Sequence, residues 1–294
     1  MTKLRRDNAR SCMAFLAVPA LLYLVFIIYP IFHSVYISLF DWQALSKEQT
    51  FIGLGNYIKT FTSNRIFGVA LLNNLKWCVG SIVLPMAVGL IIAAFISQER
   101  RGDTFLQTAV FVPVVLSVTA VGLIWRWMYD PSFGLITNIL SFLSGGSIHF
   151  NWYANPNSVI YYLILAGSWS YTGMCLCLFV SGIKNIPQDT ISAARIDGAG
   201  TWRVFWYIIL PQLRNTINAV LIYTMANAFK VFDLVFVMTN GGPGRLTNVL
   251  ASLSYETIFR YHQYGEGSAI SVLMTLILLV ISFVINRIIR IEKE

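Results

Sequence analysis

Long stretches without charged side chains divide the sequence into candidate membrane-spanning helices. Residues 11–40, 77–98 and 104–125 contain no Asp, Glu, Lys or Arg, and a bilayer-spanning helix needs only about 20 apolar residues. Residues 131–183 lack these four residue types too, but their first part is rich in Gly, Asn and Pro and is predicted to be a loop. The pattern therefore predicts six transmembrane helices, over residues 13–37, 73–97, 105–127, 158–182, 213–238 and 267–287.

The composition agrees with a single integral membrane domain over residues 1–294. The chain is 56% hydrophobic and 12% charged, with a mean hydropathy of +0.66, whereas soluble domains average about 25% charged residues. This argues against a soluble enzyme and a disordered chain. The four cysteines match neither a redox spacing nor a zinc-binding spacing, so they are predicted to be free thiols buried among apolar residues. These are Cys12, Cys78, Cys175 and Cys177.

The distribution of Lys and Arg predicts the orientation of the chain. With a cytoplasmic N-terminus, thirteen of the 21 Lys and Arg residues fall in inner segments and five in outer segments, and inner loops characteristically carry such an excess. Both termini of this all-α, multi-pass membrane protein are therefore expected in the cytoplasm. Pro19 and Pro30 and the length of the first span favour an uncleaved helix over a signal peptide. The net charge of +8 is thus an orientation signal and does not indicate a nucleic-acid partner.

The predicted cytoplasmic loop at 183–212 carries the signals of two short helices. Pro187 suits the first turn of a helix and Gly198 its C-terminal end. Thr201 is predicted to cap a second helical segment over 202–210, and Pro211 is predicted to break that segment at the membrane surface. The small side chains of the first helix favour close approach by another protein.

A motif in this loop resembles the EAA signature of ABC importer membrane subunits. The signature is Glu-Ala-Ala, three residues, Gly, nine residues and Ile-x-Leu-Pro, and every defining position matches except the first, where Ser192 stands in place of Glu. A serine does not supply the charge-assisted hydrogen bond of a carboxylate. The positions concerned are Ser192, Ala193, Ala194, Gly198, Ile208, Leu210 and Pro211.

The resemblance extends over nearly the whole chain. Residues 122–131 resemble the end of the third span, residues 230–243 the end of the fifth, and residues 265–270 the start of the sixth span of carbohydrate-uptake permeases. The maltose and glycerol-3-phosphate permease subunits are members of this group. The resemblance therefore implies uptake of a sugar, an oligosaccharide or a sugar derivative.

The resemblance also implies a mechanism and a set of partners. The chain has no Gly-x-x-x-x-Gly-Lys phosphate loop, so it is expected to bind no cofactor, while partner subunits bind ATP and Mg. The implied partners are a second related permease, two ABC ATPase subunits and an extracytoplasmic solute-binding protein. Ala193, Ala194 and Gly198 would let the short helix seat closely in an ATPase groove, and Arg195 and Asp197 would fix its register by charge. Closure of the ATPases would then rock the spans between inward- and outward-open states.

Two groups of side chains are candidates for the substrate path. Trp169, Tyr171 and Thr172 place an aromatic and polar cluster in the fourth span, a combination that suits sugars, although aromatic residues in spans most often pack or lie at interfaces. Asn227 suits sugar hydroxyls, or equally a hydrogen bond between helices. Phe229 is a further aromatic candidate on the fifth span.

Lys230 and Asp233 are two charged residues near the outer end of the predicted fifth span. On a continuous helix they would share one face at i, i+3 spacing, and charges within a membrane are functional candidates. A structural or gating ion pair is favoured over direct substrate contact.

Aromatic and glycine-rich residues mark the predicted outer surface. Trp42, Trp125, Trp127 and Trp152 are interpreted as interfacial belt residues. Residues 240–244 suit either a simple turn or a loop that faces the solute-binding protein.

Two other classes of function remain as alternatives. A self-contained secondary carrier or channel for a small polar solute would need a coupling carboxylate in mid-membrane or an internal repeat. A membrane enzyme would need a nucleophile with a base, or a metal site. His33, His149 and His262 are scattered, so no catalytic residue and no metal ligand is predicted.

Overall fold

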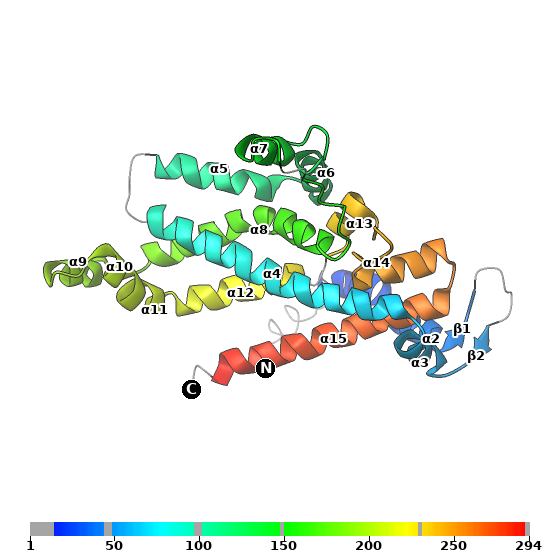
Figure 1. Ribbon diagram of the computed structural model, residues 1–294. Helices are drawn as coiled ribbons and strands as arrows, with labels where there is room; N and C mark the ends of the chain where they lie inside the picture. Colours follow the sequence, from blue (N-terminus) through cyan, green and yellow to red (C-terminus); the bar gives the residue numbers. More distant parts are fainter. Residues whose placement is uncertain (1–14, 44–48, 97–101, 148–149, 229–230, 292–294) are drawn as a thin grey trace, which may run out of the picture. The chain divides into compact units, whose positions relative to one another are not determined.

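The computed structural model describes residues 15–43, 49–96, 102–147, 150–228 and 231–291, and this part of the chain is predominantly helical (Figure 1). Contacts divide the chain into two compact units. The first unit comprises residues 1–65 and 253–281, and the second comprises residues 66–252 and 282–294. All the predicted site residues belong to the second unit.

The second unit is built on α8 (Val159–Lys184), against which α5 (Asp103–Val115) and α12 (Arg214–Ala228) pack. Gly173 of α8 permits this closeness, because a Cβ atom there would lie 2.5 Å from the carbonyl oxygen of Val110. The core includes buried Leu176, Phe179 and Leu213. The other elements are α4 (Arg65–Ile96), α6 (Val118–Met128), α7 (Leu135–Leu143), α9 (Gln188–Ile196), α10 (Thr201–Val204), η2 (Phe205–Ile209), α11 (Leu210–Gln212) and α13 (Asp233–Thr239).

The first unit combines helices with a small hairpin. The helix at Phe15–Ser38 contains a π-helical turn, and Phe40 pairs with Phe51 across the antiparallel strands that follow it. Its elements are η1 (Leu24–Ile28), α2 (Tyr29–Ser38), β1 (Phe40–Asp41), β2 (Thr50–Phe51), α3 (Gly55–Thr62), η3 (Glu256–Arg260), most of α15 (Tyr264–Ile291) and the end of α14 (Leu250–Tyr255).

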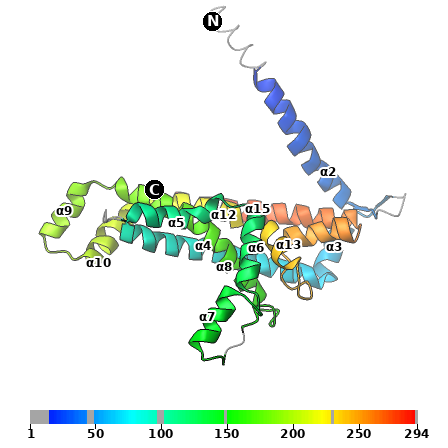
Figure 2. The same cartoon turned by 90° about the horizontal axis from the view of Figure 1, so that it is seen from above.

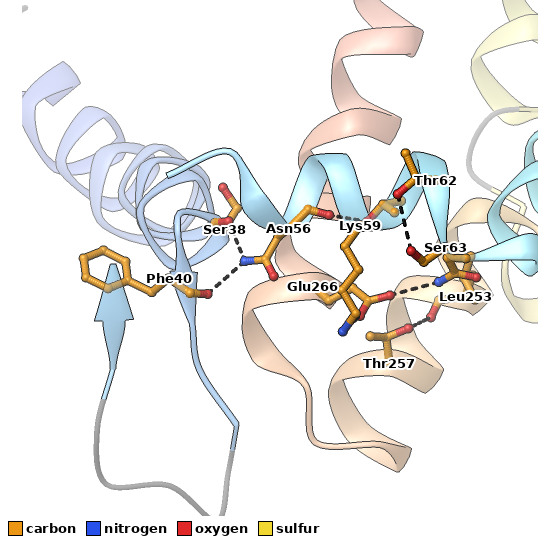
Figure 3. A network of polar contacts seen from close by, with 11 residues as sticks. Ser38, Phe40, Asn56, Lys59, Thr62, Ser63, Leu253, Thr257 and Glu266 are labelled. Atoms are coloured by element: carbon orange, nitrogen blue, oxygen red, sulfur yellow. Dashed lines mark hydrogen bonds and ion pairs between the residues drawn. The ribbon is translucent and has the colours of Figure 1, made fainter. Parts of the chain in front are cut away.

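A polar network fixes α3 within the first unit (Figure 3). Asn56 Nδ2 donates hydrogen bonds to the carbonyl oxygens of Ser38 and Phe40, both at 2.8 Å. Glu266, in the first turn of α15, is 7% exposed and pairs with Lys59 Nζ at 2.8 Å. Because a buried carboxylate is costly without a partner, this ion pair holds α3 against the start of α15.

Four helices of the described chain are long and apolar enough to cross a membrane, and two bent helix pairs raise the number to six if each pair is one span. The four single helices lie over the first, second, fourth and sixth predicted spans. They are Phe15–Ser38, Arg65–Ile96, Val159–Lys184 and Tyr264–Ile281.

The prediction of one continuous helix over 105–127 is wrong. The axes of α5 and α6 differ by 106°, because Leu116 and Ser117 have extended backbone. The Ser117 hydroxyl then caps α6 by accepting a hydrogen bond from the Ala120 amide at 3.2 Å.

The predicted continuous helix over 213–238 is also wrong. Helix α12 ends at Ala228 and α13 begins at Asp233, with an angle of 51° between them. Val231 and Phe232, which precede α13, are not helical. Composition alone did not reveal this break, because the sequence there remains largely apolar.

Candidate coupling helix and substrate path

Helix α9 presents small and charged side chains to solvent. Ile191 is buried against the core of the second unit and Ala194 is half-buried there, whereas Ser192, Ala193 and Arg195 are exposed. Figures 1 and 2 both show α9 and α10 beyond the ends of α5 and α12. One side of α9 is therefore held by the bundle, and the other is open to a partner.

Gly198 ends this helix as the sequence predicts. Its φ of +83° is a left-handed conformation that favours glycine. The Gly198 amide donates to the carbonyl of Arg195 at 3.1 Å, and the Ala199 amide donates to that of Ala194 at 2.9 Å. No heavy atom lies within 4 Å of a Cβ built on Gly198. Asp197 and Gly198 are both exposed, so this turn forms an open tip.

The helix after this turn differs from the prediction at both ends. Gly200 occupies the cap position and Thr201 is already the first residue of α10, with no side-chain cap. Pro211 lies inside α11 and does not break the helix, because a proline is tolerated in the first turn of a helical segment. The helix ends at Gln212, and the next residue, Leu213, is buried and anchors the turn into α12.

The remaining residues of the signature lie along this second segment. Ile208 and Leu210 are half-buried, and Pro211 is exposed. The core contacts of the segment come instead from Ile209 and Leu213. The apolar end of the signature therefore lies on a segment that Ile209 and Leu213 hold against the bundle, whereas its beginning lies on the open side of α9.

The two helix breaks meet at one small cavity of about 50 Å³. Val118 and Val121 line it from α6, and Ser170 and Tyr171 line it from α8. Its other lining residues are Trp77, Gly167, Val231, Phe232, Asp233 and Leu234. We call this the break cavity.

The N-terminal ends of α6 and α13 both open at the break cavity. The first amide groups of a helix have no partners within the helix and give that end a partial positive charge. Asp233 occupies the first position of α13, where a carboxylate is favourable. Among the described residues, the buried Trp77 Nε1 has no hydrogen-bond acceptor. The cavity thus combines helix ends, a carboxylate and aromatic side chains, which suits a polar ligand.

The structure brings together two of the predicted substrate-path residues and separates the others. Tyr171 and Asp233 line the same cavity. Trp169 is not among the lining residues of this cavity. Its ring packs against Trp125 instead, with the two ring centroids 5.8 Å apart. The Thr172 hydroxyl donates to the carbonyl of Ser168 at 2.8 Å, and Asn227 Nδ2 donates to that of Tyr223 at 2.8 Å. Each of these two side chains therefore already donates one hydrogen bond within its own helix.

Phe229 and Lys230 lie outside the described residues. The argument that Lys230 and Asp233 share a helix face fails, however, because it requires a continuous helix and the chain is not helical at Val231 and Phe232.

A second cavity, of about 470 Å³, lies at the opposite ends of α6 and α13. Arg126 and Asp130 line it from the end of α6, and Thr239 and Asn240 from the end of α13; Trp152, Tyr153, Pro131, Val237 and Met238 complete its lining. Sequence reasoning missed this site, because it is formed by the packing of α6 on α13. We call it the wide cavity.

Two of the predicted belt residues are buried. Trp125 and Trp152 are only 8% and 6% exposed, and their rings pack around Tyr129 at 5.1 and 5.4 Å. Burial and the neighbouring Tyr162 raise the pKa of Tyr129. The interfacial interpretation is therefore wrong for Trp125 and Trp152, whereas Trp127 is 64% exposed.

The glycine-rich segment after α13 is an ordered turn. Asn240 has a left-handed backbone, and the Gly242 amide donates to the carbonyl of Thr239 at 2.9 Å. The Thr247 amide closes the turn by donating to the carbonyl of Gly241 at 3.1 Å.

Within the described part of the chain, no three His, Cys, Asp or Glu side chains gather where they would hold a metal ion.

The fold is that of an ABC importer membrane subunit. A crystal structure of a bacterial ABC transporter involved in the import of the acidic polysaccharide alginate contains a chain that superposes with a TM-score of 0.81. The match covers 98% of this chain and 99% of the other, at 21% identity. At this identity the likeness establishes the fold and not the substrate.

A family profile adds the class of protein. The profile of the binding-protein-dependent transport system inner membrane component matches residues 86–291. Since this is more than half of the chain, the chain belongs to that family.

Similarity to individual relatives covers nearly the whole chain. The chain is 35% identical over 283 residues to the osmoprotective compounds uptake permease protein GgtC of Synechocystis sp., with 94% of this chain and 97% of that protein covered. It is 32% identical over 274 residues to the multiple sugar-binding transport system permease protein MsmF of Streptococcus mutans, with 91% of each covered.

Proposed function

We propose that the chain is the membrane-spanning subunit of an ATP-driven importer that moves a carbohydrate by alternating access. The observation that carries this proposal is α9, a helix with an open side of small and charged residues in the loop that resembles the EAA signature. Family membership supports the transport function, and the name of the Streptococcus mutans relative supports a sugar substrate. The alternative of a self-contained carrier or channel agrees less well with the family membership, because the family is described as a component of binding-protein-dependent transport systems.

The proposed topology has six spans with both termini in the cytoplasm of a bacterial cell. Two of the spans are the bent pairs α5–α6 and α12–α13. The bias of Lys and Arg toward inner segments supports this orientation. All six spans form one permease domain over residues 1–294, with the loop at 183–212 on the cytoplasmic side.

In this proposal α9 transmits ATPase closure to the bundle. Two ABC ATPase subunits bind ATP and Mg, and one of them receives the open side of α9. A second permease contributes an equivalent helix. Force on Ser192, Ala193 and Arg195 passes through Ile191 and Ala194, which contact the core of the second unit.

The substrate path follows the α6–α13 pair from the wide cavity to the break cavity. A solute-binding protein outside the cell releases the sugar at the wide cavity, whose volume of about 470 Å³ suits a small sugar. Tyr171 and Asp233 then offer polar groups at the break cavity. The break cavity is too small for a sugar, at about 50 Å³, so it opens when α6 and α13 move during the transport cycle.

Reconstitution tests this proposal. The chain is purified with its partner permease and ATPases, placed in vesicles and supplied with the liganded binding protein. Uptake should require ATP, and the binding protein should stimulate ATP hydrolysis. Uptake by the chain alone, driven by an ion gradient, would overturn the proposal.

A further inference from the structure

An aromatic and basic surface lies on the segment that follows the coupling helix. Trp202, Arg203, Trp206 and Tyr207 line a hollow of about 530 Å³ on α10 and η2. The indole rings of Trp202 and Trp206 stack with their centroids 6.4 Å apart and an interplanar angle of 14°. All four side chains are exposed, and Tyr207 is 79% exposed. We call these four residues the Trp–Arg surface.

The core fixes the direction in which this surface faces. Val204, Ile209 and Leu213 are buried in the core of the second unit together with Phe179 and Ile183. The same helical segment therefore has one face that packs on the bundle and another that carries the aromatic rings. Clustered aromatic side chains at such an open face indicate an interaction surface.

The charge of the surface indicates the chemistry of its ligand. Within the part of the chain that the structure describes, no ion pair joins Arg203 to a carboxylate, unlike Lys59 and Arg260, which pair with Glu266 and Glu256. A guanidinium group pairs with phosphate oxygens through two parallel hydrogen bonds. Trp and Tyr rings favour the headgroup level of a bilayer. An anionic phospholipid meets both requirements.

The position along the chain places this surface at the bilayer. Helix α11 and the turn at Leu213 connect it directly to α12, which begins at Arg214 and is the first half of the proposed fifth span. In the proposed topology the surface thus lies where the chain enters the inner leaflet. Exposed Trp and Tyr beside Arg are the residues that anchor amphipathic segments there.

We propose that the Trp–Arg surface binds the headgroup of an anionic phospholipid of the inner leaflet, with Arg203 on the phosphate and Trp202, Trp206 and Tyr207 against the glycerol and upper acyl chains. This inference rests on the proposed membrane topology. The bound lipid holds the second half of the coupling loop at the membrane surface, so that α9 projects toward the ATPase from a fixed base.

Quenching by brominated lipids tests the proposal. The full chain, with its partner permease, is placed in vesicles of equal parts phosphatidylcholine and phosphatidylglycerol, in which one or the other lipid carries brominated acyl chains. The difference between the wild type and the W202F/W206F variant isolates the two indoles. One cation near the bilayer surface favours an anionic lipid by about five-fold, so brominated phosphatidylglycerol should quench these indoles about five-fold more than brominated phosphatidylcholine.

Two arginine variants complete the test. Arg203→Gln should make quenching by the two lipids equal, whereas Arg195→Gln, an exposed arginine on α9, should keep the preference. Equal quenching in the wild type, or quenching that is unchanged in W202F/W206F, would overturn the proposal. Loss of quenching when the ATPase subunits are added would show that a protein covers the surface, and would also overturn it.

ATP-driven uptake measured in the same vesicles separates this inference from the proposed function. A headgroup preference without ATP-driven uptake would count against the importer and leave the lipid site intact. ATP-driven uptake without a headgroup preference would count against the lipid site alone.

Discussion

At Gly198 the backbone and the surroundings restrict a side chain in different ways. The positive φ imposes strain of roughly 1–2 kcal/mol on an L-residue, but the space around a Cβ is open. A larger side chain is therefore tolerated by the chain itself and becomes an obstacle only when a partner seats on the turn. A substitution at Gly198 therefore tests contact with a partner without preventing the chain from folding.

Gly198→Asp should reduce ATP-driven uptake by at least about ten-fold, because a charged side chain would project into the ATPase contact and seating it costs more than about 1.4 kcal/mol. The amount of the variant in the membrane should stay close to that of the wild type. Gly102→Asp is the matched control: Gly102 also has a positive φ of +105° and open space around its Cβ, but it lies at the start of α5. Equal uptake in the two variants would remove Gly198 from the coupling contact.

Neighbouring residues on α8 make a second comparison at the residue scale. Tyr171 lines the break cavity, whereas the Thr172 hydroxyl is buried and bonded to the carbonyl of Ser168 in its own helix. Tyr171→Phe should raise the substrate concentration for half-maximal uptake about five-fold, the effect of losing one hydrogen bond of about 1 kcal/mol. Thr172→Val should change it less than two-fold. The reverse order would exclude Tyr171 from the path.

Between elements, glycine residues decide how closely the helices approach. Gly173 lies where α5 crosses α8, and a Cβ atom there would meet the Val110 carbonyl, the Val114 side chain and the Phe111 backbone. Gly68 of α4 has no such neighbours within 4 Å. Substitution by alanine should therefore destabilise the protein at Gly173 but not at Gly68.

Gly173→Ala should lower the midpoint of thermal unfolding in detergent by several degrees, because overpacking costs about 1–3 kcal/mol. Gly68→Ala should leave it unchanged or raise it, because alanine favours a helix by about 0.5–1 kcal/mol relative to glycine. Temperature-dependent aggregation followed by size-exclusion chromatography measures both. Equal midpoints would mean that α5 and α8 are not held at this distance.

The same scale shows how far the sequence predicts the structure. Long apolar stretches predict the helix Val159–Lys184 within two residues at each end, because hydropathy and length determine it. The helix Arg65–Ile96 ends within one residue of its predicted end but begins eight residues before the predicted start at residue 73. The break before Val118 depends on the backbone of Leu116 and Ser117, which hydropathy does not report. The break before Asp233 was not predicted either, because it too depends on backbone conformation, which hydropathy does not report.

The sequence predicts the part of the candidate site that depends on local chain chemistry, but not the parts that depend on packing between distant segments. The turn at Gly198 follows from local chain chemistry and is confirmed. The break cavity unites Trp77 with residues of α6, α8 and α13, and such proximity depends on packing between distant segments. The hydroxyl of Thr172 and the amide of Asn227 looked available in the sequence, but each already donates a hydrogen bond to a carbonyl of its own helix.

At the scale of the whole molecule, the proposed orientation follows from the positive charges. The inner segments hold thirteen Lys and Arg residues and the outer segments five, and this bias sets the direction of insertion. The coupling loop and both termini must then lie on the same side of the membrane. A topology with an odd number of spans would not meet this requirement.

Reporter fusions check this orientation. Green fluorescent protein joined after Glu294 should fluoresce and alkaline phosphatase joined there should be inactive, because only the former works in the cytoplasm. The opposite pattern should appear for fusions after Asn155, in the proposed outer loop. Active phosphatase at Glu294 would contradict the six-span topology.

Photo-crosslinking from α9 tests the central claim most directly, because it asks whether the exposed side of this helix contacts an ATPase. In one variant benzoylphenylalanine replaces Ala193, which is exposed on α9. In the control variant it replaces Asn151, which is exposed in the proposed outer loop. In the assembled transporter, position 193 should give an adduct with the ATPase subunit, and position 151 should give none. An ATPase adduct from position 151, with none from position 193, would contradict the account.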